Sequence, residues 1–323
     1  MAKVDILTIG TLPKDTETKL DRLFQSHRAM TAAEVDAAIV AAGAGRIRAI
    51  ARGAHVGIGA ALMGRLPALE IVASFGVGYD GIDLAHAASR GIVVTNTPDV
   101  LTEEVADTTL GLLIMTVREL SAAERHLRAG RWTAGNYPLT RATLRNRTVG
   151  IAGLGRIGLA IARRLDAMGL PVVYHTRNPR PGVPYRHYPD LTAMARDVDI
   201  LIVVLPGNAE TKNLVGRPVL EALGPDGILI NVGRGTVVDE AALAEALASR
   251  TIFAAGLDVF ADEPHVPEAL IALDNVVLLP HVGSASVHTR DAMGQVVVDN
   301  LESWFGKGRP LTPVPETPFT PKG

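Results

Sequence analysis

Three segments of the sequence carry side chains that together could move a proton and bind a carboxylate. Arg234 stands between two glycines in NVGRG, Glu263 lies in DVFADEP, and His281 follows the apolar run NVVLLP. Histidine exchanges protons near neutral pH, and a carboxylate on its second ring nitrogen fixes the tautomer and favours the charged form. A guanidinium binds carboxylates through paired hydrogen bonds. Singly these are a surface arginine, a turn glutamate and a loop histidine, but together they predict acid–base chemistry on a small keto acid.

A glycine-rich turn in VGIAGLGRIG indicates a dinucleotide site. Gly153, Gly155 and Gly158 have the G-x-G-x-x-G spacing between an expected strand and an expected helix over 156–168. Such glycines allow a sharp turn, close approach of a pyrophosphate, and close packing of helix on strand. The start of the helix then offers unpaired N–H groups to the phosphates. The alternative is a purely structural turn.

The strand after this turn lacks the acidic residue that usually binds the adenosine ribose. In PVVYHTRNPR the corresponding residues are Thr176, Arg177 and Asn178, with Arg180 close behind. A carboxylate there would repel a 2′-phosphate, whereas a guanidinium binds one. The segment therefore predicts NADP(H) in preference to NAD(H), and its alternative interpretation is a solvated basic loop.

A second glycine-rich segment, FGVGYDGIDL, follows another expected strand. Gly76, Gly78 and Gly81 leave backbone N–H groups accessible, and such groups can hold a small anion. The segment is thus a candidate site for a substrate carboxylate, although a plain strand–turn–helix junction would have the same composition.

The elements that must position these residues form two series of short apolar runs. The expected strands cover 4–10, 70–75 and 91–97 in the first series, and 148–153, 171–176, 199–206, 227–233, 252–260 and 275–281 in the second. Continuous apolar runs separated by helical patterns are typical of parallel sheets that helices cover on both faces. We expect one long helix from Glu103 to about Gly130 and another after Ser286. The fold class is therefore α/β with two doubly wound parallel sheets, one domain spanning 1–98 plus 285–323 and the other 99–284.

Composition excludes several classes of site. The chain has 323 residues, with 32 Lys plus Arg and 34 Asp plus Glu. Its charges nearly balance, so no strong electrostatic field favours binding to nucleic acid or to an anionic membrane. It has no cysteine, which excludes disulfides and thiolate metal sites, and no metal site is expected. The apolar runs are too short for a signal peptide or a membrane span, and we expect a cytoplasmic protein.

In combination and order, GLGRIG, NVGRG, DVFADEP and LLPHVGSAS resemble the D-isomer-specific 2-hydroxyacid dehydrogenases. FGVGYDGIDL and HTRNPR are most similar to the glyoxylate/hydroxypyruvate and hydroxyphenylpyruvate reductases of that family, which favour NADPH. The resemblance implies a flavodoxin-like substrate domain, a Rossmann cofactor domain, a homodimer, and Arg234, Glu263 and His281 as the catalytic residues. It places Trp132 near the dimer interface and substrate mouth, with a packing anchor as the alternative.

The resemblance also implies the binding residues. Those for substrate are Val77, Gly78, Arg234 and His281. Those for the cofactor are Gly153, Leu154, Gly155, Arg156, Ile157, Gly158, Thr176, Arg177, Asn178, Leu205, Pro206, Thr211, Val232, Gly233, Asp258 and Gly283. Leu101, Trp132 and Ser284 are candidates for lining the substrate side-chain pocket.

The expected function is NADPH-dependent reduction of a small 2-keto acid, such as glyoxylate, hydroxypyruvate or an aryl pyruvate, to the D-2-hydroxy acid. Two alternatives stay open. One is NAD-dependent oxidation of a D-2-hydroxy acid, and the other is a dinucleotide-sensing regulator on the same fold, similar to the corepressors that resemble this family.

Overall fold

The chain divides into two compact units. A computed structural model describes residues 3–53 and 56–320. Unit 1 comprises Met1–Leu101 and Ser286–Gly323, and unit 2 comprises Thr102–Ala285. The first and last segments of the chain thus belong to one unit, and the whole middle segment forms the other.

Unit 1 is built on a five-stranded parallel sheet. Its strands are β1 (Asp5–Ile9), β2 (Gln25–Ala29), β3 (Ile47–Arg52), β4 (Ile71–Ser74) and β5 (Val93–Thr95). Their order is β2-β1-β3-β4-β5, with every neighbouring pair parallel. This is the flavodoxin-like order, and it confirms the predicted fold class for this unit.

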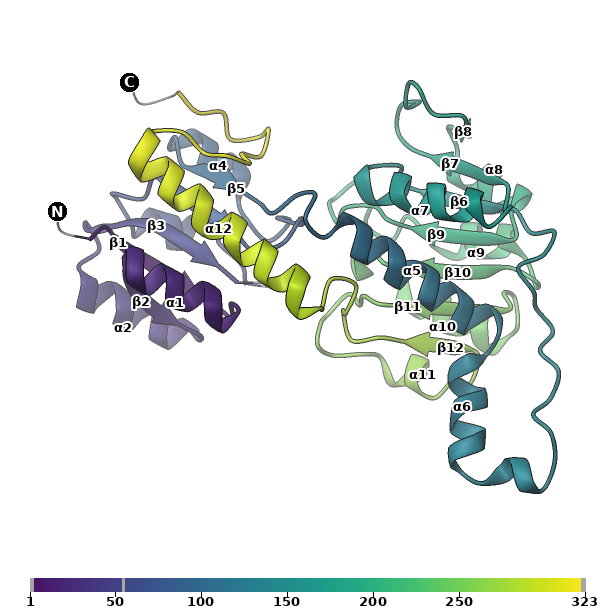
Figure 1. Ribbon diagram of the computed structural model, residues 1–323. Coiled ribbons are helices and arrows are strands. Elements are labelled where there is room, and N and C mark those ends of the chain that lie inside the picture. The colour runs from purple at the N-terminus through teal and green to yellow at the C-terminus, as the bar shows by residue number, and fades with distance from the viewer. Residues whose placement is uncertain (1–2, 54–55, 321–323) are drawn as a thin grey trace. The chain divides into compact units, whose positions relative to one another are not determined.

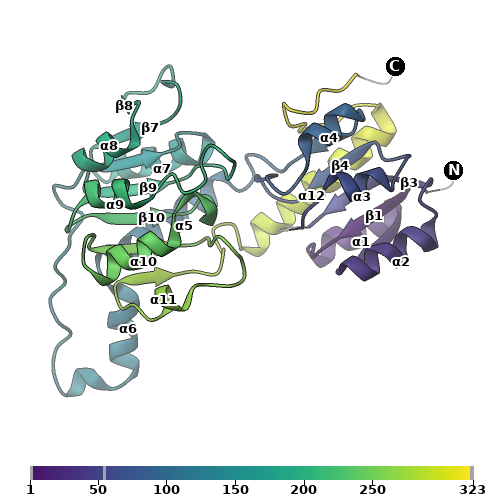
Figure 2. The same cartoon turned by 180° about the vertical axis from the view of Figure 1, so that it is seen from behind.

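Helices cover both faces of this sheet (Figures 1 and 2). They are α1 (Lys14–Leu23), α2 (Ala32–Ala42), α3 (Ala60–Gly64), α4 (Leu84–Ser89) and α12 (Val287–Lys307). Figure 1 shows α1 and α12 on one face, and Figure 2 shows α2, α3 and α4 on the other. The Ser286 hydroxyl caps α12 by accepting the N–H of Thr289, so the predicted second long helix is confirmed.

Unit 2 is built on a seven-stranded parallel sheet. Its strands are β6 (Val149–Ala152), β7 (Val172–His175), β8 (Arg186–Tyr188), β9 (Ile200–Val203), β10 (Ile228–Asn231), β11 (Ala254–Leu257) and β12 (Val276–Leu278). The order is β12-β11-β10-β9-β6-β7-β8, with all pairs parallel. Counted from β6, this is the Rossmann order 3-2-1-4-5-6 with one further strand at the edge.

Helices cover both faces of this second sheet. The helices of unit 2 are α5 (Thr102–Val117), α6 (Leu120–Arg128), α7 (Arg156–Ala167), α8 (Leu191–Asp197), α9 (Arg217–Leu223), α10 (Glu240–Ala248) and α11 (Glu268–Ile271), with 3₁₀ turns η1 (Arg131–Thr133) and η2 (Gly235–Val237). Of these, α6 and η1 lie outside the layers that cover the sheet (Figure 1). Side chains of α5 and α7 pack into the core on one face, and those of α8, α9 and α10 into the core on the other.

The long helix predicted from Glu103 to Gly130 is interrupted. It begins at Thr102, ends at Val117, and restarts as α6, because Glu119 adopts the left-handed conformation with φ of 52°. The interruption coincides with the end of the buried face: α5 buries residues up to Val117, whereas α6 buries none. Past Val117 the chain no longer packs on the sheet, and the following segment projects from the body of unit 2 (Figure 1).

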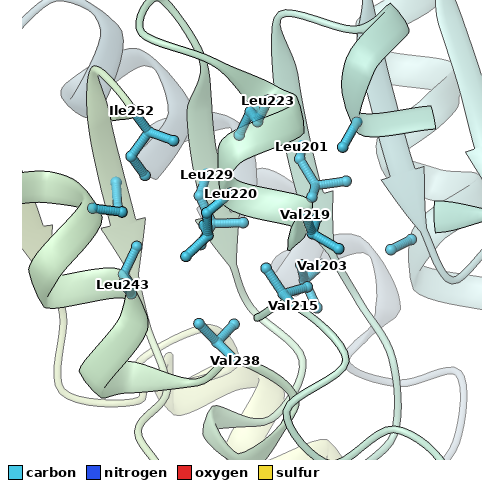
Figure 3. Close-up of a cluster of buried hydrophobic side chains, with 14 of the residues drawn as sticks. Leu201, Val203, Val215, Val219, Leu220, Leu223, Leu229, Val238, Leu243 and Ile252 are labelled. Carbon is cyan, nitrogen blue, oxygen red and sulfur yellow. The ribbon is translucent and has the colours of Figure 1, made fainter. Parts of the chain in front are cut away.

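The α8–α10 side of unit 2 encloses a close-packed apolar cluster (Figure 3). Strands contribute Leu201, Val203 and Leu229, and the helices contribute Leu220 and Leu243, all fully buried. Burying such aliphatic side chains is the main favourable contribution to folding of an α/β unit.

Leu220→Ala should therefore destabilise unit 2 by about 2–5 kcal/mol, the usual cost of a cavity left by a buried leucine. Ile271, which is 60% exposed at the end of α11 in the same unit, provides the control, and Ile271→Ala should stay within about 0.5 kcal/mol of the parent. Urea unfolding measures both. Equal midpoints for the two variants would contradict the placement of Leu220 in the core.

Candidate active site

His281 and Glu263 form a hydrogen-bonded pair beyond the carboxyl ends of two adjacent strands. His281 Nδ1 lies 2.8 Å from Glu263 Oε2, with 29% of the histidine side chain and 19% of the glutamate side chain exposed. The other carboxylate oxygen, Oε1, accepts the N–H of Phe260 at 3.0 Å. The carboxylate is thus fixed by its own loop, and its second oxygen orients the imidazole.

Asp258 fixes the loop that follows the histidine. Its two carboxylate oxygens accept the N–H of Val282 at 2.7 Å and of Gly283 at 2.8 Å. His281 itself has φ of 52°, a left-handed conformation that costs energy in a non-glycine residue and must be held by its surroundings. Burial raises the pKa of the Asp258 carboxyl, and its two backbone hydrogen bonds oppose that rise. Asp258 therefore sets the conformation of the loop on which His281 is placed.

Arg234 lies on a tight turn after β10, the neighbour of β11. Asn231 clamps this turn, accepting the N–H of Gly233 at 3.1 Å and donating to the carbonyl of Arg234 at 3.0 Å. Side chains are excluded at both flanking glycines. A Cβ on Gly233 would lie 2.7 Å from the Leu205 carbonyl oxygen, and one on Gly235 would lie 1.8 Å from the Phe260 carbonyl carbon.

The three predicted residues thus come from loops at one edge of one sheet. The order β12-β11-β10 brings the loops of His281, Glu263 and Arg234 next to one another, and Gly235 packs directly on the loop of Glu263 through Phe260. Open α/β sheets bind their ligands at the carboxyl ends of their strands.

The glycine turn has the geometry that a dinucleotide requires. Gly153 has φ of 102°, and a Cβ on Gly158 would lie 2.0 Å from the Gly153 carbonyl oxygen, so these two positions are restricted to glycine by the turn and by the packing of α7. Gly155 differs, because a Cβ there would meet nothing within 4 Å. It is the N-cap of α7 and offers no side-chain cap, so it leaves space beside the helix N-terminus for a phosphate.

The two arginines of the basic segment after β7 make different kinds of contact. Arg180 donates to the carbonyl oxygens of Leu154 and, at 3.0 Å, of Gly155, which places its guanidinium against the glycine turn. Arg177 pairs instead with Glu210 in an exposed ion pair. Thr176 Oγ1 donates to the Asn178 carbonyl oxygen at 2.7 Å and closes the turn between them.

The other predicted cofactor residues lie on the same side of unit 2. Thr211 Oγ1 donates to the Pro206 carbonyl oxygen at 2.7 Å, which folds the loop after β9 back toward Leu205. Val232 is buried directly after β10. Among the described residues, no group of three or more His, Asp or Glu side chains could hold a metal ion.

In unit 1, the candidate anion loop follows β4. Gly76 has φ of 130°, its N–H donates to Thr97 Oγ1 at 3.0 Å, and the carbonyl of Val77 accepts from Asn96 Nδ2 at 2.9 Å. Of the three residues suggested for the side-chain pocket, Trp132 is exposed on η1, whereas Leu101 and Ser284 are buried.

Sequence reasoning missed two supporting residues. Asn231 is the last residue of β10, a buried and otherwise apolar strand. A polar residue at the end of such an apolar run is the feature of the sequence that could have identified it. Glu240, at the start of α10, accepts the N–H of Ala261 at 2.8 Å and so fixes the loop that leads to Glu263. Burial raises the pKa of the Glu240 carboxyl, and the nearby Asp262 and Glu263 raise it further, while the hydrogen bond lowers it.

Comparison with known proteins identifies the family. Residues 110–283 match the NAD-binding domain of the D-isomer specific 2-hydroxyacid dehydrogenases. A glyoxylate/hydroxypyruvate reductase A of Arabidopsis thaliana is 45% identical over 314 residues, which cover 97% of this chain and 100% of the relative. The chain belongs to this family. The predicted resemblance is thereby confirmed, and this 2-hydroxyacid dehydrogenase uses a nicotinamide dinucleotide as its cofactor.

Other relatives of this 2-hydroxyacid dehydrogenase cover almost the whole chain. A hydroxyphenylpyruvate reductase of Plectranthus scutellarioides is 44% identical, with 97% of this chain and 100% of the relative covered. A crystal structure of an NADPH-dependent glyoxylate/hydroxypyruvate reductase from Sinorhizobium meliloti, in complex with NADP and malonate, is 55% identical with a TM-score of 0.94 and covers 100% of both chains. Within residues 3–53 and 56–320, no helix of the dehydrogenase has both the length and the apolarity needed to cross a membrane.

Substitution by alanine should weaken cofactor binding at Gly155 and stability at Gly158. Gly155→Ala should leave the unfolding midpoint near that of the parent yet weaken dinucleotide binding by about tenfold or more, because its methyl occupies the space for the phosphates. Gly158→Ala should destabilise unit 2 itself, since its Cβ would overlap the Gly153 carbonyl. Calorimetric titration with NADPH and thermal unfolding together separate the two effects. Unchanged cofactor affinity in Gly155→Ala would contradict this assignment of the site.

Proposed function

We propose that this protein reduces a small 2-keto acid to the D-2-hydroxy acid with NADPH. The observation that carries the proposal is the 2.8 Å bond between His281 Nδ1 and Glu263 Oε2, on the strand edge that also presents Arg234. Glyoxylate, hydroxypyruvate and aryl pyruvates are the substrate candidates, since relatives named for glyoxylate, hydroxypyruvate and hydroxyphenylpyruvate match nearly the entire chain.

In the proposed reaction the protein supplies a proton and holds the substrate. When bound, the reduced nicotinamide supplies a hydride to the keto carbon. His281 donates its proton from Nε2 to the keto oxygen, while Glu263 at Nδ1 stabilises the charged imidazolium before the transfer. Arg234 orients the substrate and stabilises the negative charge that develops on the oxygen, and the N–H groups of Val77 and Gly78 bind the substrate carboxylate.

We further propose that the basic segment after β7 selects NADPH. It offers Thr176, Arg177 and Asn178 where a carboxylate would favour NADH. The Arg177 side chain is 77% exposed, so its guanidinium can turn from Glu210 toward a 2′-phosphate at little cost, because an exposed ion pair contributes at most about 1 kcal/mol. Arg180 supports this role because it lies on the glycine turn itself.

We also propose that the protein forms a homodimer through the segment that projects from unit 2. This segment leaves Leu120, Leu127, Trp132 and Leu139 exposed, and α6 has no buried residue. Exposed apolar side chains gathered on one segment are typical of an interface. Sedimentation analysis of the parent protein and of a Leu127→Asp variant would test the proposal.

His281→Ala should lower kcat by about 10²- to 10⁴-fold while NADPH affinity stays close to that of the parent, because only the proton donor is lost. His265→Ala, on the same loop as Glu263 and well exposed, is the control and should keep near-normal turnover. Glu263→Gln should also lower kcat, because the imidazole loses the carboxylate that orients it. NADPH absorbance with the three keto acids measures each effect. Normal turnover in His281→Ala would refute the mechanism, and absence of turnover in the parent would favour a dinucleotide-sensing regulator.

Arg177→Glu should reduce kcat/KM for NADPH by roughly 10- to 100-fold, the usual worth of a charged hydrogen bond to phosphate, and leave that for NADH almost unchanged. The matched control is Arg217→Glu, which removes a similarly exposed ion pair with Glu245. Steady-state kinetics with both cofactors measure the ratio. An unchanged NADPH/NADH ratio in Arg177→Glu would show that another residue selects the cofactor.

A further inference from the structure

The candidate anion loop of unit 1 is held by the two residues that follow β5. The N–H of Thr97 donates to the Gly76 carbonyl oxygen at 3.0 Å, and the Gly76 N–H donates to Thr97 Oγ1 at the same distance. The amide nitrogen Nδ2 of Asn96 donates to the Val77 carbonyl oxygen at 2.9 Å. The carbonyls of two consecutive residues in the loop are therefore both fixed.

Fixing these carbonyls also fixes the N–H groups that we assign to the substrate carboxylate. In a planar trans peptide the C=O and the following N–H point in opposite directions. The Gly76 carbonyl thus sets the direction of the Val77 N–H, and the Val77 carbonyl sets that of the Gly78 N–H. In the part of the chain that the structure describes, neither N–H donates to a protein acceptor.

Asn96 is in turn held by the segment that follows α12. The Thr312 hydroxyl donates to the Asn96 carbonyl oxygen at 2.6 Å, and the Asn96 N–H donates to the Thr312 carbonyl oxygen at 3.3 Å. Asn300, fully buried on α12, accepts the N–H of Leu311 at 2.9 Å and that of Thr312 at 3.0 Å, and donates to Thr312 Oγ1 at 2.9 Å. A continuous chain of hydrogen bonds thus runs from α12 to the anion loop.

The same segment makes further contacts with β5 and with the far end of the loop. Val314 N–H donates to the Val94 carbonyl oxygen, and Thr317 Oγ1 accepts the Val94 N–H, both at 2.9 Å. The Tyr79 hydroxyl, one residue beyond Gly78, lies 3.3 Å from Glu316 Oε1. Residues 311–317 therefore contact the anion loop from both of its ends, through Asn96 and through Tyr79.

We propose that residues 311–317 are a brace that positions the substrate-binding N–H groups, with Thr312 and Asn96 as positioning residues. The inference rests on the proposed function of Val77 and Gly78. The brace acts on a group that binds the carboxylate equally in the ground state and in the transition state. Its loss should therefore raise KM for the keto acid and leave kcat nearly unchanged.

Thr312→Val tests the brace, because it removes the hydroxyl and nearly preserves the volume of the side chain. KM for the keto acid should rise about five- to tenfold, whereas kcat and KM for NADPH should stay within about twofold of the parent. Thr312→Ser keeps the hydroxyl and should restore the parent KM. Thr18→Val is the matched control, since the exposed Thr18 hydroxyl donates within α1, to the Lys14 carbonyl oxygen at 2.8 Å. Asn96→Asp places an acceptor opposite the Val77 carbonyl and should raise KM further.

A measurement without turnover separates the brace from the proposed function. Amide hydrogen exchange of a peptide covering residues 75–79 should accelerate in Thr312→Val and not in Thr312→Ser or Thr18→Val. Binding of oxamate, an unreactive mimic of glyoxylate, to the NADPH complex should weaken in parallel. If the parent reduces none of the three keto acids, the proposed function fails, while faster exchange in Thr312→Val alone still supports the brace. The proposed brace would be overturned if KM for the keto acid and the rate of amide exchange were both unchanged in Thr312→Val. It would also be overturned if Thr312→Val and Thr312→Ser lost kcat and thermal stability equally.

Discussion

The candidate active site depends on one buried carboxylate that holds two consecutive backbone N–H groups. Asp258 directly follows β11, and its oxygens accept the N–H groups of Val282 and Gly283 beyond β12, so it links the loops of two neighbouring strands. His281 lies immediately before this link and has a left-handed backbone, a conformation that a valine or leucine would rarely adopt. The link therefore restrains the loop from which the His281 ring reaches the Glu263 carboxylate.

Close backbone packing extends this constraint to Arg234. Gly233 lies against the loop after β9, and Gly235 lies against the loop after β11. Since neither position has room for a Cβ, the turn of Arg234 is fixed by the loops on either side of it. Charged groups held in this way need little reorganisation energy when charge develops on a substrate. Such preorganisation is the usual source of electrostatic stabilisation in enzymes.

The sequence alone predicted those parts of the molecule in which a local pattern determines the structure. The apolar runs that became β6, β9 and β10 are buried on both faces, and their pattern is continuous. By contrast, β2 has the sequence QSHRA and lies next to β1 at the edge of its sheet, so no apolar run marks it. The interruption at Glu119 has no glycine or proline to signal it, because it arises where packing on the sheet ends. Two further features depend on tertiary contacts between segments that are distant in sequence. One is which of Arg177 and Arg180 contacts the glycine turn. The other is the chain of hydrogen bonds from Asn300 to Val77.

The discontinuity of unit 1 has a consequence for how the protein is made. All five strands of its sheet lie before residue 96, but α12, which covers one face with Met293, Val297, Leu301 and Trp304, is synthesised only after the whole of unit 2. Trp304 Nε1 donates to Glu70 Oε2 at 3.0 Å, so the contact joins residues that leave the ribosome far apart in time. Unit 2 is complete by Ala285 and can fold on the ribosome while that face of unit 1 is still uncovered. Unit 1 therefore keeps one apolar face uncovered until α12 has followed unit 2.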